Sequence, residues 1–321
     1  MKRKGTKIFK RLLTSALIIT TIICGSNWSV SANETVLDYN VIIVCDANGN
    51  ITYETIQEKS TFDVEENTIE YEAEENSLVI PQNNNDISAL SFSGLAKVQD
   101  TEDSPYRNVC YILAQYSDGH ISHSSGILVG FNLVLVSAHG VYDDKHGGFA
   151  KSVTVSPGAY LDANGKLVQP LGSANKTGIR APSGWINLKN DAYDWALVGL
   201  DKSFTTYQIY GYAQDYTKAI NRNITIMGYP QNADSIYYSK GRITGTTDGA
   251  SDASHVGLWT TSATSQSGMS GGPVIDEATG AVIGIIKGEA YNIIGISKGN
   301  VSVPFTEFVV NTIKSYKEDL K

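Results

Sequence analysis

The chain has 321 residues, of which 41% are hydrophobic and 18% are charged, and this composition is typical of a globular protein rather than a disordered one. Its formal net charge is −8, and no cluster of basic residues indicates that it binds nucleic acid. The charge is unevenly distributed, because residues 33–90 carry thirteen acidic side chains against one lysine.

The first 32 residues have the parts of a secretory signal peptide. Six Lys and Arg side chains precede an apolar segment at Leu12–Cys24, and Val30, Ser31 and Ala32 supply small side chains for cleavage. A permanent membrane anchor is the alternative, but hydroxyl side chains dilute a run that is already short for a span. We therefore expect a secreted protein with no stable membrane span once residues 1–32 are removed.

Residues 33–90 combine a short ordered stretch with a polar tract. Val41–Val44 predicts a strand and Asn48-Gly49 a hairpin turn, whereas Asp63–Glu75 is rich in carboxylates and Pro81–Asp86 is rich in asparagine. Such a polar stretch is typical of an exposed linker that proteases cut. We interpret residues 33–90 as an acidic prosegment, with a small acidic accessory domain that stays attached as the alternative.

The three cysteines, Cys24, Cys45 and Cys110, fall in three different regions of the chain. A mature chain that begins near residue 90 keeps one of them and forms no internal disulfide. A transient bridge between Cys45 and Cys110 in the longer chain is the alternative.

From Val109 onward, short apolar runs separated by glycine and asparagine predict β-strands. The first series is Val109–Tyr116, Ile127–Val129, Leu133–Ser137, Val153–Val155 and Trp195–Leu200, and the second is Ile224–Met227, Ile236–Tyr238, Gly257–Thr261, Val274–Ile275, Val282–Ile286 and Ile293–Ile296. Repeated short strands with turns such as Asn164-Gly165 are typical of antiparallel barrels. We expect an all-β fold over residues 91–321, with two antiparallel six-stranded β-barrels at about residues 98–200 and 221–303. A C-terminal helix follows at 304–317, where apolar residues recur at helical spacing.

The segment Ser265–Pro273 packs one serine, Ser270, among glycines. Glycine lets a chain turn sharply, and the amides of Gly268 and Ser270 can then point at one spot beside the hydroxyl as an oxyanion hole. A serine hydroxyl needs a histidine base and a carboxylate that orients the histidine. We assign these roles to His139, which ends an apolar run, and Asp194, which begins another. An isolated carboxylate there would be costly without a partner.

Other carboxylates compete for the role of Asp194. Asp191 is the local rival, in a polar turn, and Asp143 and Asp144 are weaker candidates.

The order His, Asp, Ser separates the scaffolds that use such a triad. Gly268–Gly272 also fits the G-x-S-x-G turn of α/β-hydrolases, but their histidine follows the serine and the last histidine here is His255. Subtilisin-like enzymes carry the triad in the chain order Asp, His, Ser, whereas here the aspartate lies between the histidine and the serine. A chymotrypsin-like double barrel remains.

We expect no metal and no organic cofactor. His120, His123 and His146 lie in loop-like surroundings without a glutamate or cysteine that completes a ligand set. Asp46–Asn50 has the start of a calcium loop, but Gln57 stands where its twelfth ligand is needed.

With these residues in place, the chain resembles the secreted glutamyl endopeptidases of staphylococci and bacilli, a branch of the chymotrypsin/trypsin-like serine proteases, over residues 98–315. The landmarks are Pro105-Tyr106-Arg107, Ser137-Ala138-His139, Asp194-Trp195-Ala196-Leu197, Gly228-Tyr229-Pro230, Ser239–Ile243 and Gly268–Pro273. The resemblance implies a signal peptide, a removed prosegment and a double barrel.

The resemblance also indicates the specificity pocket. Thr264 and Ser265 match its base, and Ile286, Lys287 and Gly288 match the strand beside it. Members that cut after glutamate carry a histidine where Ile286 stands, so an acidic, a small and an apolar preference all stay open. The Lys287 side chain either pairs its positive charge with an acidic side chain of the substrate or points into solvent.

We therefore expect a secreted serine endopeptidase, made as a proenzyme and active as a monomer on protein or peptide substrates after an activating protease cuts near residues 86–95. A catalytically idle toxin or binding module on the same fold is one alternative. A housekeeping envelope protease is another, although such enzymes carry an appended peptide-binding domain and only a helix follows Val303 here.

Overall fold

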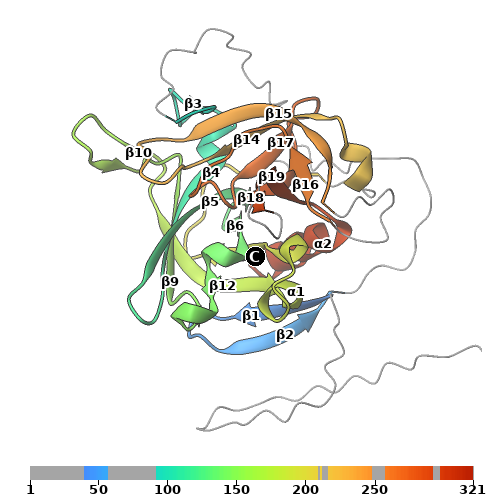
Figure 1. Cartoon of the computed structure of the whole chain (residues 1–321). Helices are drawn as coiled ribbons and strands as arrows, with labels where there is room; N and C mark the ends of the chain where they lie inside the picture. Colours follow the sequence, from blue (N-terminus) through green and yellow to red (C-terminus); the bar gives the residue numbers. More distant parts are fainter. Residues whose placement is uncertain are drawn as a thin grey trace, which may run out of the picture. The chain divides into compact units, whose positions relative to one another are not determined.

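The computed structural model describes residues 40–56, 92–208, 210–211, 216–247, 257–291 and 297–320. Two closed, antiparallel six-stranded barrels and a C-terminal helix account for most of this part of the chain (Figure 1). The predicted fold class is confirmed. The expected signal peptide, residues 1–32, and most of the acidic prosegment lie outside the described residues, as does the strand expected at Ile293–Ile296.

The first barrel closes where β12 pairs with β13. Its strands follow the ring order β13-β6-β5-β4-β9-β12. Their bounds are β4 (Val109–Gln115), β5 (Ile121–Gly130), β6 (Leu133–Val136), β9 (Ser152–Pro157), β12 (Ala174–Pro182) and β13 (Ala196–Leu200). Closure gives each of these six strands a neighbour on both sides, which is how small β-barrels avoid exposed hydrogen-bonding groups, although β9 reaches only Ala174 and Asn175 of β12.

The second barrel closes where β14 pairs with β15, in the ring order β14-β17-β18-β19-β16-β15. Its strands are β14 (Asn223–Gly228), β15 (Tyr237–Thr246), β16 (Trp259–Thr261), β17 (Pro273–Asp276), β18 (Val282–Tyr291) and β19 (Ser297–Pro304). A short strand, β3 (Ala96–Lys97), adds to the outside of β15. Each apolar run predicted in this region lies in or overlaps a strand, apart from the one outside the described residues.

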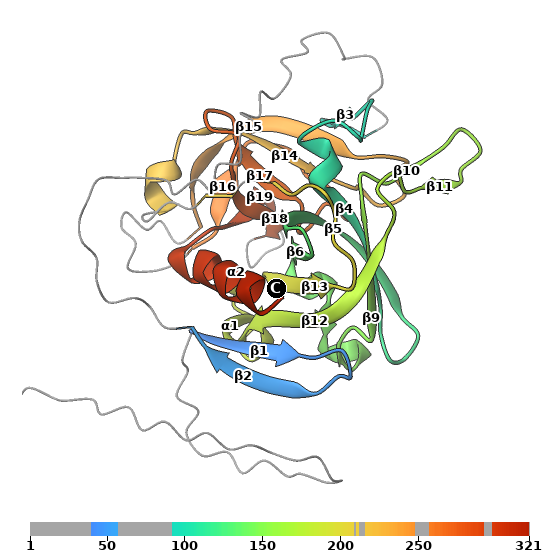
Figure 2. The same ribbon diagram turned by 180° about the vertical axis from the view of Figure 1, so that it is seen from behind.

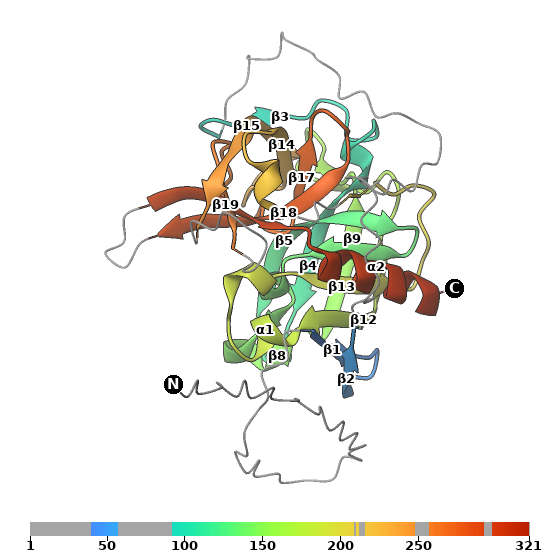
Figure 3. The same ribbon diagram turned by 90° about the vertical axis from the view of Figure 1, so that its right-hand side faces the viewer.

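Short elements join the barrel strands. The hairpins are β7 (Tyr142–Asp143) with β8 (Gly148–Phe149), and β10 (Tyr160–Leu161) with β11 (Leu167–Val168). The second hairpin contains the predicted Asn164-Gly165 turn. Helix α1 (Ser183–Ile186) is a single turn, and α2 (Glu307–Asp319) is the expected C-terminal helix. Figures 2 and 3 show α2 beside β12 and β13.

The described part of residues 33–90 is built into the first barrel. Strands β1 (Val41–Cys45) and β2 (Ile51–Thr55) form a hairpin, and β1 pairs antiparallel with the C-terminal half of β12 (Figures 1 and 2). In the connecting turn, Asp46 Oδ1 accepts the Asn48 and Asn50 amides, both at 2.8 Å. Asp46 therefore caps a hairpin turn, as the sequence predicts.

Cys45 and Cys110 are both buried free thiols with no bridge between them in this structure, and the transient bridge stays untested. Both side chains pack in the core of the first barrel. Burial raises the pKa of each thiol and holds it in the unreactive protonated form. No helix in the described ranges has the length and apolarity that a membrane crossing requires.

Candidate active site

His139 and Asp194 are joined by two hydrogen bonds. The His139 ring nitrogen Nδ1 lies 2.7 Å from Asp194 Oδ2, and the His139 backbone N–H donates to Asp194 Oδ1 at 2.9 Å. The Asp194 side chain is fully buried, whereas 37% of the His139 side chain is exposed. One carboxylate therefore holds both the ring and the backbone of a histidine whose far edge is open.

The pairing of two barrel strands brings these residues together. His139 lies in a 3₁₀ turn, Ala138–Gly140, that follows the fully buried β6. Asp194 ends another 3₁₀ turn just before β13. Because β6 and β13 are antiparallel with Ala196 opposite Val136, the residues before β13 meet those after β6. An apolar run that ends in histidine is thereby brought beside an apolar run that begins with aspartate.

The serine loop of the second barrel packs against the first barrel. The carbonyl of Ser270 accepts the Ser125 amide of β5 at 2.9 Å, and Ser125 Oγ donates to the Gly268 carbonyl at 2.8 Å. Gly271, at φ +85°, packs against the backbone of Ser125 and Ser137, so no Cβ fits there. The glycine after Ser270 lets the two barrels approach at the strand end that precedes His139.

Lys287 on β18 contacts both Ser270 and Asp194. Its backbone carbonyl accepts the Ser270 hydroxyl at 3.0 Å. Its amine lies 3.1 Å from Asp191 Oδ1 and 3.9 Å from Asp194 Oδ2. Ser270 and the His139–Asp194 pair thus lie around one lysine.

The Ser270 hydroxyl points at Lys287 rather than at the imidazole, and no hydrogen bond joins it to His139 in the described part of the chain. Nucleophile and base are often poorly aligned in ligand-free enzymes and align only when substrate binds. A rotation of the Ser270 side chain is therefore the step that the arrangement requires before any proton transfer.

Backbone geometry at Gly268 turns its amide away from Gln231. Gly268 has φ +91°, and the Ser267 carbonyl before it accepts the Gln231 amide at 2.7 Å. In a trans peptide the N–H points opposite to that carbonyl. Neither the Gly268 N–H nor the Ser270 N–H donates to another described residue, which leaves both donors open to a ligand.

The charges around His139 decide its protonation. Burial lowers its pKa, but the Asp194 charge and hydrogen bond raise it more strongly, so the net shift is upward; Lys287 opposes that shift and Asp191 adds to it. Burial raises the pKa of Asp194, and the His139 charge, its hydrogen bonds and Lys287 reverse this to a net lowering. The pair therefore favours an ionised Asp194 beside a histidine that is a stronger base than usual.

Replacing Lys287 with methionine is expected to move the pH profile of a reaction that uses His139 as its base. The change removes a positive charge that lowers the pKa of His139, so the pKa rises and the acidic limb of log(kcat/KM) moves to higher pH. The profile is measured with one peptide substrate over the stable pH range. Lys240→Met is the control, because the Lys240 amine pairs with Glu277 at 3.4 Å instead, and a limb that stays in place or moves to lower pH in Lys287→Met contradicts the expectation.

The predicted pocket residues occupy neighbouring strands of the second barrel. Ser265 Oγ donates to Asn300 Oδ1 at 2.5 Å. Thr264 donates its amide to Ser239 Oγ at 3.0 Å, and its side chain lies against the backbone of Gly94. Ile286 is buried in the apolar core. Asn300 was not predicted, because it lies on β19, which carries no apolar run to mark it.

Gly288 and Lys287 contribute in different ways. Gly288 has φ +132°, and a Cβ at this position would lie 3.8 Å from Ser270 Oγ. The Lys287 side chain is 21% exposed and its amine is directed at Asp191. The sequence did not predict this ion pair, and the roles expected for Lys287 in the pocket stay predictions.

His120, His123 and His146 are the other histidines that the structure describes, and their rings make two separate sets of contacts. His120 and His146 stack with ring centroids 3.7 Å apart, and His146 Nδ1 lies 2.7 Å from Asp118. His123 stacks on Tyr111 instead, at 4.5 Å, and burial lowers its pKa to about 4. No group of three or more metal-ligating side chains occurs in the described ranges.

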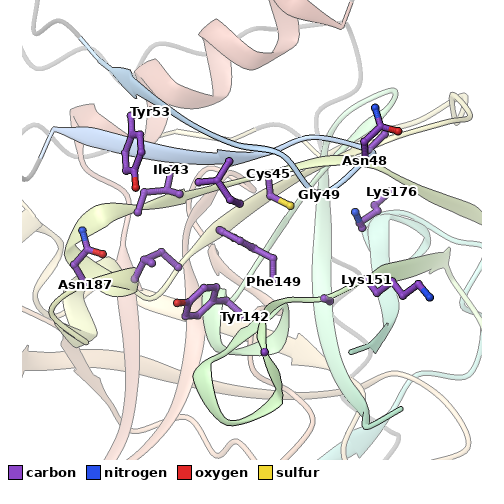
Figure 4. Close-up of a pocket in the computed structure, with 16 residues that line it drawn as sticks. Ile43, Cys45, Asn48, Gly49, Tyr53, Tyr142, Phe149, Lys151, Lys176 and Asn187 are labelled. Carbon is purple, nitrogen blue, oxygen red and sulfur yellow. The ribbon is translucent and has the colours of Figure 1, made fainter. Parts of the chain in front are cut away.

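A groove of about 640 Å³ lies apart from these residues, between the β1–β2 hairpin and the β7–β8 hairpin. Figure 4 shows Ile43, Cys45 and Tyr53 on one side and Tyr142 and Phe149 on the other. Its lining includes none of His139, Asp194 and Ser270.

Comparisons with known proteins agree with the fold. A family model described as a trypsin-like peptidase domain matches residues 124–285, which include His139, Asp194 and Ser270. The glutamyl endopeptidase of Bacillus licheniformis is 31% identical over 144 residues, which span 44% of this chain and 42% of that protein. The match therefore covers less than half of the relative's own length.

Two solved structures share the fold. One is a Glu endopeptidase in complex with MPD, with a TM-score of 0.55 and 23% identity over 71% of this chain and 98% of that one. The other is the thermostable serine protease AL20 from an extremophilic microorganism, with a TM-score of 0.52 and 16% identity over 67% of this chain and 98% of that one. Because the family model matches half of the chain and its match contains all three candidate residues, the chain belongs to the trypsin-like peptidase family.

Proposed function

We propose that the protein is a secreted serine endopeptidase that hydrolyses peptide bonds through an acyl-enzyme intermediate. The observation that carries the proposal is the bidentate contact of Asp194 with His139 beside a serine loop that has two open amides. A histidine whose Nδ1 is held by a buried carboxylate presents Nε2 as a base.

In the proposed reaction, Ser270 Oγ leaves the Lys287 carbonyl and attacks the substrate carbonyl carbon. His139 takes the hydroxyl proton and later gives it to the leaving amine, while Asp194 stabilises the imidazolium. The Gly268 and Ser270 amides hold the oxyanion, and each such donor typically contributes about 3 to 4 kcal/mol. Water then repeats the attack on the acyl-enzyme and releases the acid product.

The proposed substrates are protein or peptide chains with a polar or acidic side chain before the scissile bond. Thr264, Ser265 and Asn300 supply hydroxyl and amide groups, and the Gly94–Thr264 contact supports an amino terminus near the pocket after processing. A charged amine there favours glutamate over glutamine. Comparing kcat/KM for peptides that differ only in Glu, Gln or Ala at this residue tests the preference.

The proposed enzyme is made as a proenzyme with a signal peptide at residues 1–32. An activating protease cuts near residues 86–95, and the mature enzyme acts as a monomer without a cofactor. The basic residues before the apolar segment Leu12–Cys24 and the acidic composition of residues 33–90 support an extracellular proenzyme.

Labelling with a fluorophosphonate is expected to modify Ser270 and no other serine. The reagent forms a stable adduct with a serine that an adjacent base activates. Peptide mass spectrometry of the processed protein locates the adduct, and a His139→Ala variant is the matched control that should stay unlabelled. A folded, unlabelled wild-type protein would count against the proposal and favour the catalytically idle alternative.

A further inference from the structure

We infer that residues 40–56 are a structural part of the first barrel, which stays bound without a covalent link after the chain is cut between the hairpin and residue 92. The inference rests on the proposed processing, because only a cut chain raises the question. The processed protein is then a two-chain complex rather than a single mature chain.

On one side of β12, strand β1 pairs with residues that β9 does not reach. The pairing of β9 with β12 covers only Ala174 and Asn175, and β13 pairs on the other side of β12 as far as Arg180. β1 pairs with residues 179–182, from Cys45 opposite Ile179 to Ile42 opposite Pro182. Without β1, this part of β12 would expose unpaired backbone groups to solvent.

Both faces of β1 are buried. Ile43 and Cys45 are each 3% exposed and pack in the core of the first barrel, whereas Ile42 on the other face packs in a cluster that includes α2. A strand buried on both faces is typical of the interior of a sheet rather than of a removable edge. β2 is mostly exposed and is the edge strand of the sheet.

A buried arginine ties the hairpin to the C-terminal helix. Arg180 of β12 is 6% exposed, and its Nη2 lies 2.9 Å from Glu54 of β2 and 2.6 Å from Asp319 of α2. Its guanidinium also lies over the Tyr316 ring, 3.8 Å from the centroid. Loss of the hairpin would remove one of the two carboxylates that compensate the Arg180 charge, and an uncompensated charge that stays buried is unfavourable.

The hairpin does not reach the proposed catalytic groups. The hydrogen bonds and ion pairs of strands β1 and β2, within the described ranges, go to each other, to their connecting turn and to β12, and none goes to the Gly268–Gly272 loop. The influence of the hairpin on the site runs through β12 to β13, since Arg180 pairs with Leu197 and Asp194 precedes that strand. Retention of the hairpin therefore supports the position of Asp194 without blocking it.

The test uses the full chain with Ser270→Ala, so that its outcome does not depend on activity. A recognition sequence for an unrelated, sequence-specific protease, flanked by Gly-Ser residues, is inserted within the asparagine-rich residues 83–85 and cut. We expect native mass spectrometry and size-exclusion chromatography to show both fragments in one complex, and hydrogen exchange to show the amides of residues 179–181 as protected as in the uncut chain. Separation of the fragments, or deprotection of these amides, would overturn the inference.

A charge reversal tests the anchoring ion pair. Glu54→Arg places a positive charge beside Arg180, so the N-terminal fragment should dissociate from the cut protein at a lower urea concentration. Thr55→Arg introduces the same charge on the exposed next residue of β2, whose side chain points to the other face, and should behave as the parent does. Equal dissociation of the two variants would overturn the assignment of Arg180 as the anchor. Fluorophosphonate labelling of the cut chain with Ser270 intact reports the proposed catalysis separately.

Discussion

A Ser270→Ala variant of the processed protein is expected to lose about 10⁶-fold in kcat, because removing the nucleophile of such a triad leaves only the oxyanion donors and substrate binding. The alanine removes one oxygen, whose hydrogen bond in the free protein goes to the Lys287 carbonyl. Hydrolysis of denatured casein and of one fluorogenic peptide measures the loss.

The control for this prediction is Ser203→Ala, at an exposed serine of the connection that follows β13. It should keep the activity of the parent protein within a factor of two or so, since an exposed surface substitution has little effect. Circular dichroism and thermal unfolding establish that both variants are folded. A parent protein with no more activity than Ser270→Ala would contradict the proposed endopeptidase and support the idle toxin or binding module.

An Asp194→Asn variant is expected to lose about 10⁴-fold in kcat at neutral pH, the loss that this substitution produces in Ser-His-Asp proteases. Asp194 Oδ2 accepts from His139 Nδ1 at 2.7 Å. An amide group there can donate to Nδ1 instead, which stabilises the wrong tautomer and turns Nε2 from an acceptor into a donor. The rate is measured by steady-state kinetics across pH.

Asp191→Asn is the matched control, because Asp191 is the local rival from the sequence and an exposed carboxylate that pairs with Lys287. It acts on His139 only through its charge, so its loss should be at most about tenfold. A larger loss in Asp191→Asn than in Asp194→Asn would transfer the orienting role to Asp191.

Together these two predictions distinguish the residues proposed to take part in the reaction from the residues that change the charge around His139. Asp191 and Lys287 form an ion pair beside Asp194. Asp191 raises the pKa of His139, whereas Lys287 lowers it. We therefore expect substitutions in this pair to move the pH profile more than the maximal rate, whereas substitutions in the proposed triad change the rate itself.

The amino-acid sequence by itself determined the fold class, the approximate position of most barrel strands and the three candidate catalytic residues. Runs such as Leu133–Val136 and Ala196–Leu200 are fully buried in the barrel, and continuous burial makes a strand visible as an apolar run. The glycines around Ser270 were equally visible, because the turn requires positive φ at Gly268 and Gly271.

Only the tertiary structure decided the features that depend on contacts between distant strands. β12 contains Lys176, Gly178 and Arg180 and gives no apolar signal, yet it closes the first barrel and holds β1. Asn300 contacts Ser265, which lies 35 residues away in the chain. Lys287 contacts Asp191, which lies much farther away in the chain. Strand register and barrel closure set such pairs, and local sequence patterns carry no information about them.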